Sequence, residues 1–444
     1  MHKTQPHFVR ISGRFVSAPL IALIAALSTP SESTAGAFAL TEHNAVGLGV
    51  GYSSAAVAAD ASTTYFNPAG LTRLEKPELI VVAHLIKLDA TFTDAGSNTA
   101  GVFPIGGGNG GNAGSTEVIP SLYYAHPINS TFTFGLGLSA PWGLQTEYDD
   151  GWVGRYHALK TRLESANLNP SFGWRLSDTL SFGAGFNIQQ VKAEIGNAID
   201  FGLVGFSMGI PGFLPGGADA EVFIKGDSVD YGWNAALLWE PSPGIRFGVS
   251  YRSGMTHEID GDATFTSVPA PFAAAFPNQA ASAGLAVPDI WSVHAMHRFN
   301  DRWMLTADYS LFGFGSLRSI DIDFSNPATQ DSSLVQNWRD AAIYSAGLHY
   351  RATDAVTLRA GYVYNQSPVT NAALRSPRIP DSNRRWITAG LSWKASAGFT
   401  FDAGYARVSF SDAPISITDD FGHTLLGAGD MSADVFSVQG TWSF

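Results

Sequence analysis

Hydrophobic residues occupy every second position through most of the chain after residue 76. Between residues 354 and 366, Val356, Leu358 and Tyr362 share one face of an extended segment, while Thr357 and Arg359 lie on the other. An alternation of period two is typical of a β-strand with one apolar face. The same alternation is found in residues 180–188, 245–251 and 303–311.

Short polar turns separate successive pairs of these strands. They lie at residues 127–130, 176–179, 240–244, 299–302, 351–354 and 394–398. The connections between the pairs are longer, so one end of the molecule carries short turns and the other carries long loops. This asymmetry is typical of outer-membrane barrels.

A further strand at each end of this region completes the predicted sheet. One lies at residues 79–91 and the other at residues 434–444. The total is about 14 strands, an even number as bacterial barrels have. The sheet must close on itself because an open edge in lipid would leave backbone groups unpaired. The predicted fold is therefore an all-β, transmembrane antiparallel β-barrel.

The final strand adds a second indication of an outer-membrane protein. Phe436, Trp442 and Phe444 share one face, and the chain stops on the last of them. A terminal Phe resembles the signal read by the outer-membrane assembly machinery, which we therefore expect as a partner. The expected surroundings are outer-membrane lipid and lipopolysaccharide.

The first 35 residues are typical of a cleaved secretory signal peptide. Lys3, Arg10 and Arg14 precede an apolar run at residues 15–27, and small residues at 33–35 form a cleavage site. No later stretch reaches the roughly 20 apolar residues of a transmembrane helix. We expect residues 1–35 to be removed and the mature chain to be exported.

A segment rich in Gly and Ala follows the signal peptide. Residues 36–74 are almost uncharged and contain the turn Asn67-Pro68-Ala69-Gly70. The segment has neither strand alternation nor a long amphipathic helix, and its small residues suit a peptide that packs inside another structure. We predict a small N-terminal hatch domain at residues 36–76, which plugs a barrel formed by residues 77–444.

Composition narrows the function. Only 14% of residues are charged, against about 25% in soluble domains, so much of the surface faces something other than water. The absence of Cys excludes disulfides and thiolate zinc sites. A net charge of −12 argues against nucleic-acid binding.

Motifs of catalysis are missing from the chain. It has no Gly-x-Ser-x-Gly elbow, no His-Glu-x-x-His and no phosphate loop. His294 and His297 lie on opposite faces of a strand, so they do not form a metal pair. We expect no catalytic residues, no metal, no cofactor and no enzymatic activity.

Six ordered blocks of sequence carry a family resemblance. They are Asn67-Pro68-Ala69-Gly70 and residues 143–148, 163–170, 288–291, 365–369 and 379–386. By these blocks the whole mature chain resembles the FadL family of outer-membrane transporters for long-chain fatty acids and other hydrophobic compounds. The resemblance implies passive diffusion through an extracellular apolar groove, a luminal pocket, a hatch that rearranges and a lateral exit through the wall.

The resemblance assigns the hatch turn Asn67, Pro68, Ala69 and Gly70 to the gate. Gly and Ala neighbours would allow rearrangement at little steric cost. Whether this turn moves when a ligand arrives, or only blocks the lumen, stays open.

A break in the third strand is the expected lateral opening. Proline lacks the donor that strand pairing needs, and a closed barrel has no edge strand to accommodate it, so a bulge or kink is expected. The residues concerned are Ser139, Ala140, Pro141, Trp142 and Gly143. The alternative is that Pro141 lies above the membrane and only starts a loop.

Two long apolar loops are the predicted ligand-collecting groove, since an exposed apolar area of this size marks a binding surface. The groove candidates are Phe201, Leu203, Val204, Phe206, Met208, Ile210, Phe213, Leu214, Phe272 and Phe276. The alternative is that the two loops only pack on each other as a lid.

A fatty-acid carboxylate needs a cation or a cluster of donors, because an unpaired buried charge is costly. The possible carboxylate contacts are Arg375, Arg378, Arg384 and Arg385. The alternative is that these residues contact lipopolysaccharide phosphates or neighbouring acids.

Two aligned regions depart from the fatty-acid prototype of the family. Residues 195–197 and 333–335 contain no basic side chain, which puts a carboxylated substrate in doubt. Uptake of toluene-like aromatic hydrocarbons is therefore the alternative function. A general diffusion porin or an adhesin fits less well, because the chain has a predicted plug and apolar loops.

Overall fold

The computed structural model describes residues 37–444 of the chain. The predicted signal peptide, residues 1–35, lies outside the described residues. Within residues 37–444 no helix is both long and apolar enough to cross a membrane.

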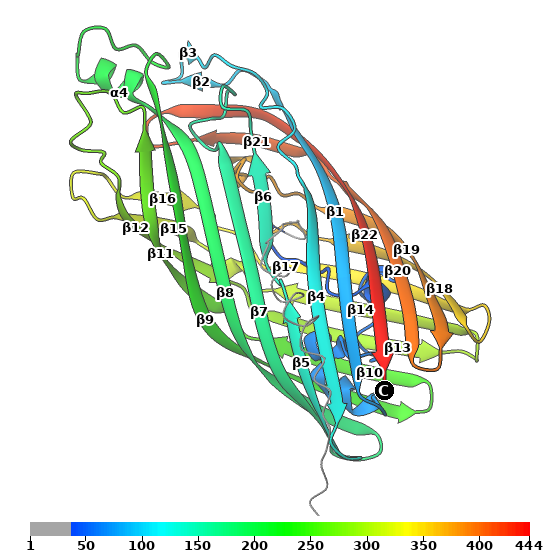
Figure 1. Cartoon of the computed structure of the whole chain (residues 1–444). Helices are drawn as coiled ribbons and strands as arrows, with labels where there is room; N and C mark the ends of the chain where they lie inside the picture. The colour runs from blue at the N-terminus through cyan, green and yellow to red at the C-terminus, as the bar shows by residue number, and fades with distance from the viewer. Residues whose placement is uncertain (1–36) are drawn as a thin grey trace, which may run out of the picture. The chain divides into compact units, whose positions relative to one another are not determined.

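The wall is one antiparallel sheet of 14 strands, as predicted (Figure 1). It closes because β1 pairs with β4 on one side and with β22 on the other, where Leu79 lies opposite Trp442 and Leu85 opposite Phe436. The continuous strands are β1 (Glu78–Asp94), β4 (Thr116–Pro127), β7 (Lys160–Arg175), β8 (Leu180–Asp200), β9 (Asp219–Ser242), β18 (Val356–Asn365), β19 (Arg384–Ser396) and β22 (His423–Ser443).

The other strands of the wall are each interrupted and consist of two segments. The third strand is β5 (Phe132–Ser139) with β6 (Gly143–Glu147), and the seventh is β10 (Ile245–Arg252) with β11 (Met255–Thr266). The eighth is β12 (Gln279–Val287) with β13 (Ile290–Arg298), and the ninth is β14 (Trp303–Phe312) with β15 (Ser319–Phe324). The tenth is β16 (Ser332–Val335) with β17 (Ala341–Arg351), and the thirteenth is β20 (Phe399–Phe410) with β21 (Ala413–Thr418).

Connections differ in length at the two ends of the barrel, as predicted. Each of the six predicted turns joins two neighbouring strands, and these turns lie at the lower end in Figure 1. The upper end carries β2 (Asn98–Thr99), β3 (Phe103–Pro104) and α4 (Phe201–Ser207). η3 (Ala372–Leu374) lies in the connection between β18 and β19, and η2 (Phe314–Ser316) lies in the interruption of the ninth strand. The last strand is longer than predicted, because residues 423–433 also pair with neighbouring strands.

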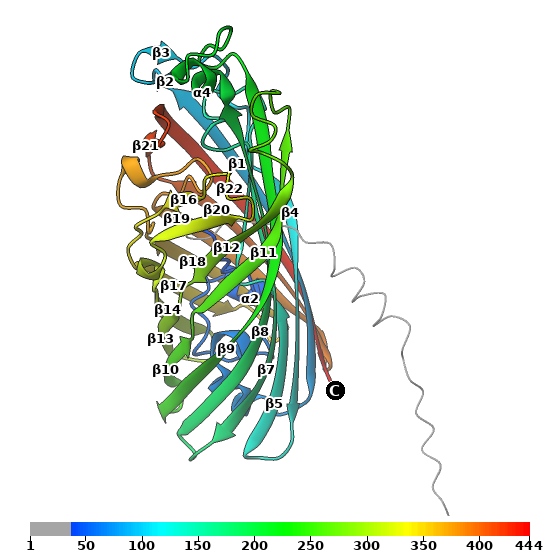
Figure 2. The ribbon, with the colours of Figure 1, turned by 90° about the vertical axis from the view of Figure 1, so that its left-hand side faces the viewer.

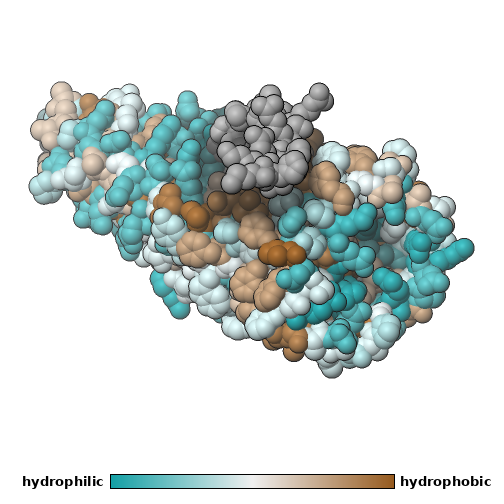
Figure 3. Space-filling model, turned by 60° about the horizontal axis from the view of Figure 1, so that its bottom comes forward, coloured by the Kyte–Doolittle hydropathy of each residue, from teal (hydrophilic) through white to brown (hydrophobic). Residues whose placement is uncertain are grey.

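Aromatic side chains are frequent on the outer face near the short turns. Phe132 stacks on Trp174 with ring centres 5.6 Å apart, and Trp303 lies 4.5 Å from Tyr350. Aromatic girdles of this kind mark the membrane interface of barrels. On the face seen in Figure 3, hydrophobic and hydrophilic residues are interspersed rather than segregated.

Residues 37–74 lie within the barrel and form little regular structure (Figures 1 and 2). They contain α2 (Ala45–Leu48), α3 (Thr63–Phe66) and η1 (Pro68–Arg73). Asn44 caps α2, since its Oδ1 accepts the Gly47 N–H at 2.8 Å, and Asn67 caps η1 by accepting the Ala69 N–H at 3.1 Å. We call residues 37–74 the hatch.

Glycines on the luminal face of the wall let the hatch backbone approach the wall closely. A Cβ on Gly361 would lie 2.3 Å from the carbonyl carbon of Val50, and a Cβ on Gly390 would lie 2.7 Å from the Cα of Gly49. On the other side of the hatch, a Cβ on Gly183 would lie 2.2 Å from the Ala69 nitrogen. Any side chain at these wall positions would force the hatch to move.

Arginines of the wall donate hydrogen bonds to carbonyl oxygens of the hatch. Arg246 donates to the Val57 oxygen at 2.6 Å, Arg252 donates to the Tyr65 oxygen at 3.1 Å, and Arg175 donates to the Thr72 oxygen. These bonds satisfy backbone groups that the irregular hatch cannot pair internally.

We predict that Gly183→Ala destabilises the packing of the hatch by about 1–3 kcal/mol, the usual cost of overpacking. The barrel should still form, but the hatch should become accessible to protease at lower temperature. The control is Gly284→Ala, because a Cβ there meets only the Glu258 Oε2 atom at 4.0 Å. Equal protease resistance of the two variants would show that this contact is not tight.

Candidate functional site

The third strand is broken at Ala140, Pro141 and Trp142, the centre of the predicted kink. Ser139 still pairs with Asn167, and pairing resumes where Gly143 lies opposite Glu164. Three residues therefore face two on β7, which is a β-bulge. The hydroxyl of Ser165 accepts the Trp142 N–H at 2.9 Å and donates to the Trp142 oxygen at 2.6 Å, so a side chain replaces the missing ladder bonds.

The wall is not hydrogen-bonded on the other side of this break. Pairing between β4 and β5 ends where Leu122 meets Leu138, and among the described strands β6 pairs with β7 alone. The stretch of β4 from Thr116 to Ser121 pairs only with β1. The sheet therefore has a gap between β4 and β6 that no ladder bond closes.

The start of the hatch pairs with the break. The Leu40 N–H donates to the Pro141 oxygen and the Gly143 N–H donates to the Phe38 oxygen, both at 2.9 Å. Ala39 and Trp142 form an antiparallel bridge. Residues 38–40 thus act as a short added strand, which we call the gate strand.

An apolar cavity lies on one side of the gate strand. It has about 710 Å³ of empty space, counting the part open to solvent, and its lining includes Phe38 from the gate strand. The wall contributes aliphatic side chains from seven strand segments. They include Leu144, Leu163, Ile195, Ile224, Ile259, Leu285 and Ile322.

Successive side chains of a strand face opposite sides of the wall, and by this alternation no cationic side chain of the wall points into the apolar cavity. Arg162 and Lys225 border it, yet each lies between neighbours that face the lumen, such as Thr161 and Leu163. Arg162 pairs with Glu164 at 2.5 Å, and Lys225 pairs with Glu194 at 3.1 Å on the outer surface. Their charges therefore belong to the outer face.

A folded loop separates the apolar cavity from a larger polar cavity. Ile379 of this loop lines the apolar cavity, and its neighbour Arg378 lines the polar one. The loop is held by Tyr148, which donates to the Pro377 oxygen at 2.9 Å, and by Thr146, which donates to the Arg378 oxygen at 3.1 Å. We call the polar cavity, of about 1,230 Å³ including open solvent, the vestibule.

Arg378 is the one predicted carboxylate contact that borders a described cavity. Its guanidinium donates to the Gly196 oxygen at 3.2 Å and to Asn197 Oδ1 at 2.9 Å, both neutral acceptors, and its Nε has no partner. Burial lowers the pKa of Arg378 to about 10, so the group stays cationic at neutral pH. The Arg378 guanidinium, which comes from another loop, thus places a positive charge beside residues 195–197, where the sequence itself has no basic side chain.

The other three predicted arginines have different surroundings. Arg375 donates to the carbonyl oxygens of Asp381 and Pro414, at 2.8 and 2.5 Å. Arg384 forms a buried ion pair with Asp381, and Arg385 is exposed on the outer side of β19. None of the three lines the cavities described here.

The two predicted apolar loops pack against each other. Phe201 stacks on Phe272 at 4.8 Å and lies 5.0 Å from Phe276, while Phe213 lies 5.6 Å from Phe272. Val204 borders the vestibule. The remaining groove candidates are solvent-accessible: Leu203 and Ile210 in part, and Phe206, Met208 and Leu214 with exposed fractions of 47%, 66% and 64%.

The predicted hatch turn lies away from the gate strand, against β8 and β9. Asn67 is fully buried, and its Nδ2 donates to the Leu237 oxygen at 3.2 Å. Pro68 and Ala69 approach Gly183, and Gly70 lies near Thr63 and Ala58. The segment that meets the break is therefore residues 38–40, which sequence reasoning did not select.

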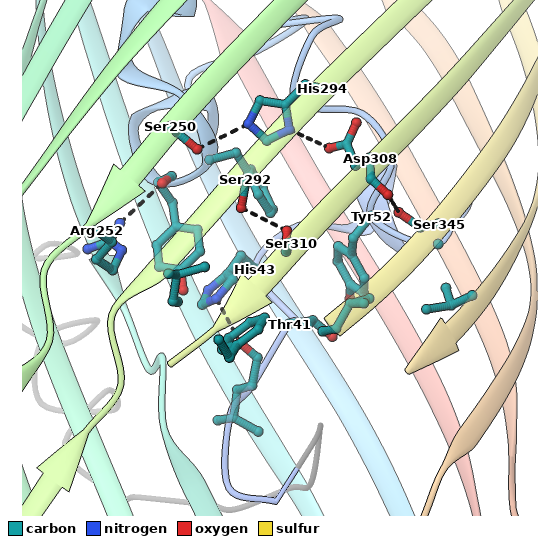
Figure 4. Close-up of a pocket in the computed structure, with 18 of the residues that line it drawn as sticks. Thr41, His43, Tyr52, Ser250, Arg252, Ser292, His294, Asp308, Ser310 and Ser345 are labelled. Atoms are coloured by element: carbon teal, nitrogen blue, oxygen red, sulfur yellow. Dashed lines mark hydrogen bonds and ion pairs between the residues drawn. The ribbon is translucent and has the colours of Figure 1, made fainter. Parts of the chain in front are cut away.

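A second luminal cavity lies on the far side of the gate strand (Figure 4). It has about 850 Å³ of empty space, counting the part open to solvent. The hatch presents an aromatic face to it, where His43 stacks on Tyr65 at 3.5 Å. The wall presents a polar face, and we call this space the lower cavity.

Hydrogen bonds across neighbouring strands organise the polar wall of the lower cavity. Ser250 lies 3.1 Å from His294 Nε2, and His294 Nδ1 lies 2.9 Å from Asp308 (Figure 4). His294 on β13 lies directly opposite Asp308 on β14, whereas Ser250 on β10 lies opposite Ser292, two residues from His294. His297 is exposed on the opposite face, and no cluster of three His, Asp or Glu residues suited to a metal occurs within residues 37–444.

Glu42, which follows the gate strand, is a fully buried carboxyl group. Its Oε2 accepts the Thr41 N–H at 2.8 Å, and its Oε1 has no hydrogen-bond partner among the described residues. Burial raises the pKa of Glu42 to about 7. The hatch therefore contains a carboxyl group that is only partly ionised at neutral pH.

Comparisons with known proteins agree with this architecture. A family model described as outer membrane protein transport protein (OMPP1/FadL/TodX) matches residues 25–444. The chain is 29% identical to a long-chain fatty acid transport protein of Escherichia coli over 88% of this chain and 90% of that protein. It is 26% identical to outer membrane protein P1 of Haemophilus influenzae over 84% and 86% of the two chains.

Solved structures share the fold. A FadL homologue of Pseudomonas aeruginosa superposes with a TM-score of 0.86 at 25% identity, covering 92% of this chain and all of that one. The toluene transporter TodX of Pseudomonas putida gives a TM-score of 0.66 at 18% identity, covering 86% and 94%.

We predict that Ser165→Ala loosens the broken third strand, because the Trp142 N–H would lose its acceptor at a cost of about 1–3 kcal/mol. Hydrogen exchange at the Trp142 amide should accelerate. Ser171→Ala on the same strand is the control, since the Ser171 hydroxyl has no partner to lose. Unchanged exchange in both variants would contradict the assigned role of Ser165.

We predict that the Glu42 carboxyl group stabilises the hatch most at acidic pH. The folded pKa of Glu42, about 7, exceeds its ordinary value of 4.5, so its contribution falls by about 1.4 kcal/mol per pH unit between these values and then levels off. His43 acts in the opposite direction, because burial lowers its pKa below the ordinary value of 6.5, so the quantity to measure is the difference between variants. The difference between the unaltered protein and Glu42→Gln in the urea concentration that exposes the hatch to protease should follow the Glu42 slope. Glu75→Gln, at an exposed residue just after the hatch, should give no such difference; a difference for Glu42→Gln that does not change with pH would refute the assignment.

Proposed function

Because the chain belongs to the outer membrane protein transport protein (OMPP1/FadL/TodX) family, we propose that it carries long-chain fatty acids across the outer membrane by passive diffusion. Members of this family are outer-membrane transporters of hydrophobic compounds and not enzymes. The chain is accordingly an outer-membrane transport protein, as predicted. The substrate and the route are the proposal.

One observation carries the choice of substrate: a buried cation in the loop that lies between the vestibule and the apolar cavity. Arg378 has only neutral acceptors and borders the vestibule, and the adjacent Ile379 lines the apolar cavity. An uncompensated buried charge is costly, and a ligand carboxylate would supply the missing counter-charge. An alkyl chain would then lie among the aliphatic side chains, gaining about 0.8 kcal/mol per buried methylene.

The proposed route begins at the exposed apolar side chains Phe206, Met208 and Leu214 of the α4 loop. It passes the vestibule and the apolar cavity and reaches the gate strand. Displacement of residues 38–40 would uncover the gap between β4 and β6, through which an apolar molecule leaves sideways into lipid. The hatch turn at Asn67–Gly70 would have to move only if the ligand continued past the gate strand toward the short-turn end of the barrel.

Aromatic hydrocarbons are the second candidate. The apolar cavity itself contains no cation that points inward, and pockets of roughly 300–1,000 Å³ suit small ligands in general. The fold is shared with a protein described as a toluene transporter. A neutral aromatic ligand would use the same cavity without Arg378.

We predict that Arg378→Gln weakens oleate binding by about 10- to 100-fold, the cost of a lost charged hydrogen bond, and leaves toluene binding unchanged. Equilibrium binding to purified protein measures both. Arg385→Gln is the matched control, since that side chain faces outward. Toluene binding without any oleate binding would favour the second candidate, and rapid uptake of sugars by liposomes carrying the protein would refute both.

A further inference from the structure

The lower cavity contains a second buried cation without a counter-charge. Arg252, at the end of β10, is 6% exposed and lines this cavity. Its guanidinium donates to Asn187 Oδ1 and to the Tyr65 oxygen at 3.1 Å, and it stacks 4.4 Å from the Tyr65 ring. Both hydrogen-bond acceptors are neutral, and no ion pair within residues 37–444 includes Arg252.

Three other arginines with buried or nearly buried side chains each have a carboxylate partner. Arg384 pairs with Asp381, Arg359 lies 3.6 Å from Asp402, and Arg155 lies 2.7 Å from Asp219. Arg252 differs from these three arginines because it has no carboxylate partner among the described residues. A buried guanidinium in this state favours an anion, because the interaction gains strength where water is excluded.

Unused hydrogen-bond donors surround the same cavity. They come from the hatch and from three wall strands, and each is buried with no partner in the structure. These atoms are the Tyr52 hydroxyl, Asn234 Nδ2, Asn365 Nδ2 and Trp386 Nε1. A ligand that carries acceptor oxygens would satisfy such groups, whereas a hydrocarbon would leave them unpaired.

Apolar side chains complete the lining. Leu40 and Phe66 of the hatch face Phe312, Ile343 and Val363 of the wall. The lower cavity is therefore amphipathic, with a cation at one side and space for an alkyl chain beside it. The gate strand divides it from the apolar cavity, since Phe38 lines the one and Leu40 the other.

We propose that the lower cavity is a second binding site for a carboxylate-bearing amphiphile, with Arg252 as its anion-binding group. The inference rests on the proposed function and extends it to a two-station path, with Arg378 above the gate strand and Arg252 below it. A carboxylate at Arg252 competes with the Tyr65 oxygen for the guanidinium. Occupancy of this site therefore weakens one of the bonds that hold the hatch to the wall.

Native mass spectrometry of the full-length mature protein, released from detergent micelles with oleate, counts the bound molecules. The unaltered protein should bind two oleates, and Arg252→Gln and Arg378→Gln should each bind one. Arg252→Lys should keep two, since the charge remains. Oleyl alcohol, which lacks the charge, should respond to neither substitution.

Arg246→Gln is the matched control for loosening of the hatch. Arg246 also donates to a hatch carbonyl, but it pairs with Glu240 at 3.1 Å and does not line the lower cavity. This variant should still bind two oleates. Two oleates bound to Arg252→Gln would overturn the inference.

Failure of the inference and failure of the proposed function give different results. No oleate on the unaltered protein refutes the proposed function. A single oleate that Arg378→Gln removes leaves that function standing and overturns the second site.

If Arg252→Gln does not fold, crystals of the unaltered protein soaked in 2-bromo-oleate decide the question. An anomalous bromine peak beside Arg252 supports the site, and a peak beside Arg378 alone overturns it.

Discussion

Hydrogen bonding of the hatch backbone to the wall is the constraint on which the structure depends. The hatch forms only short helices, so some of its peptide groups have no partner within it, and the wall supplies partners for several of them. Guanidinium groups of Arg175, Arg246 and Arg252 reach carbonyl oxygens of Thr72, Val57 and Tyr65. These contacts stabilise the hatch inside the barrel.

The two unpaired buried arginines and the cavities that they border follow one another along the lumen. Arg155 and Arg384 are each paired with a carboxylate, but Arg378 and Arg252 face only neutral acceptors and each borders a cavity. The gate strand separates the two cavities and also pairs with the broken third strand. One short segment of the hatch therefore lies both between the two cavities and against the gap in the wall.

Local patterns were enough to predict the barrel. Alternating residues and polar turns such as 127–130 report strand pairing directly, and Pro141 marks a break because proline lacks a donor. The breaks at residues 336–340 and 411–412 contain no proline, so nothing local indicated them. The site depends on contacts distant in sequence. Arg378 borders the vestibule because its loop binds Tyr148, and Arg252 borders the lower cavity, where β10 places it beside Tyr65. Neither contact leaves a periodic signal.

The contact of the hatch with the last strand has a consequence for assembly. Gln439 on β22 accepts the Ala45 N–H and donates to Asp60, both at 3.1 Å. The same strand pairs with β1 and so closes the sheet. The strand synthesised last thus carries both the seam and a clamp on the segment that precedes the barrel. A barrel whose last strand is in place thus has both its seam and this contact with the hatch, so closure of the wall and attachment of the plug depend on the same strand.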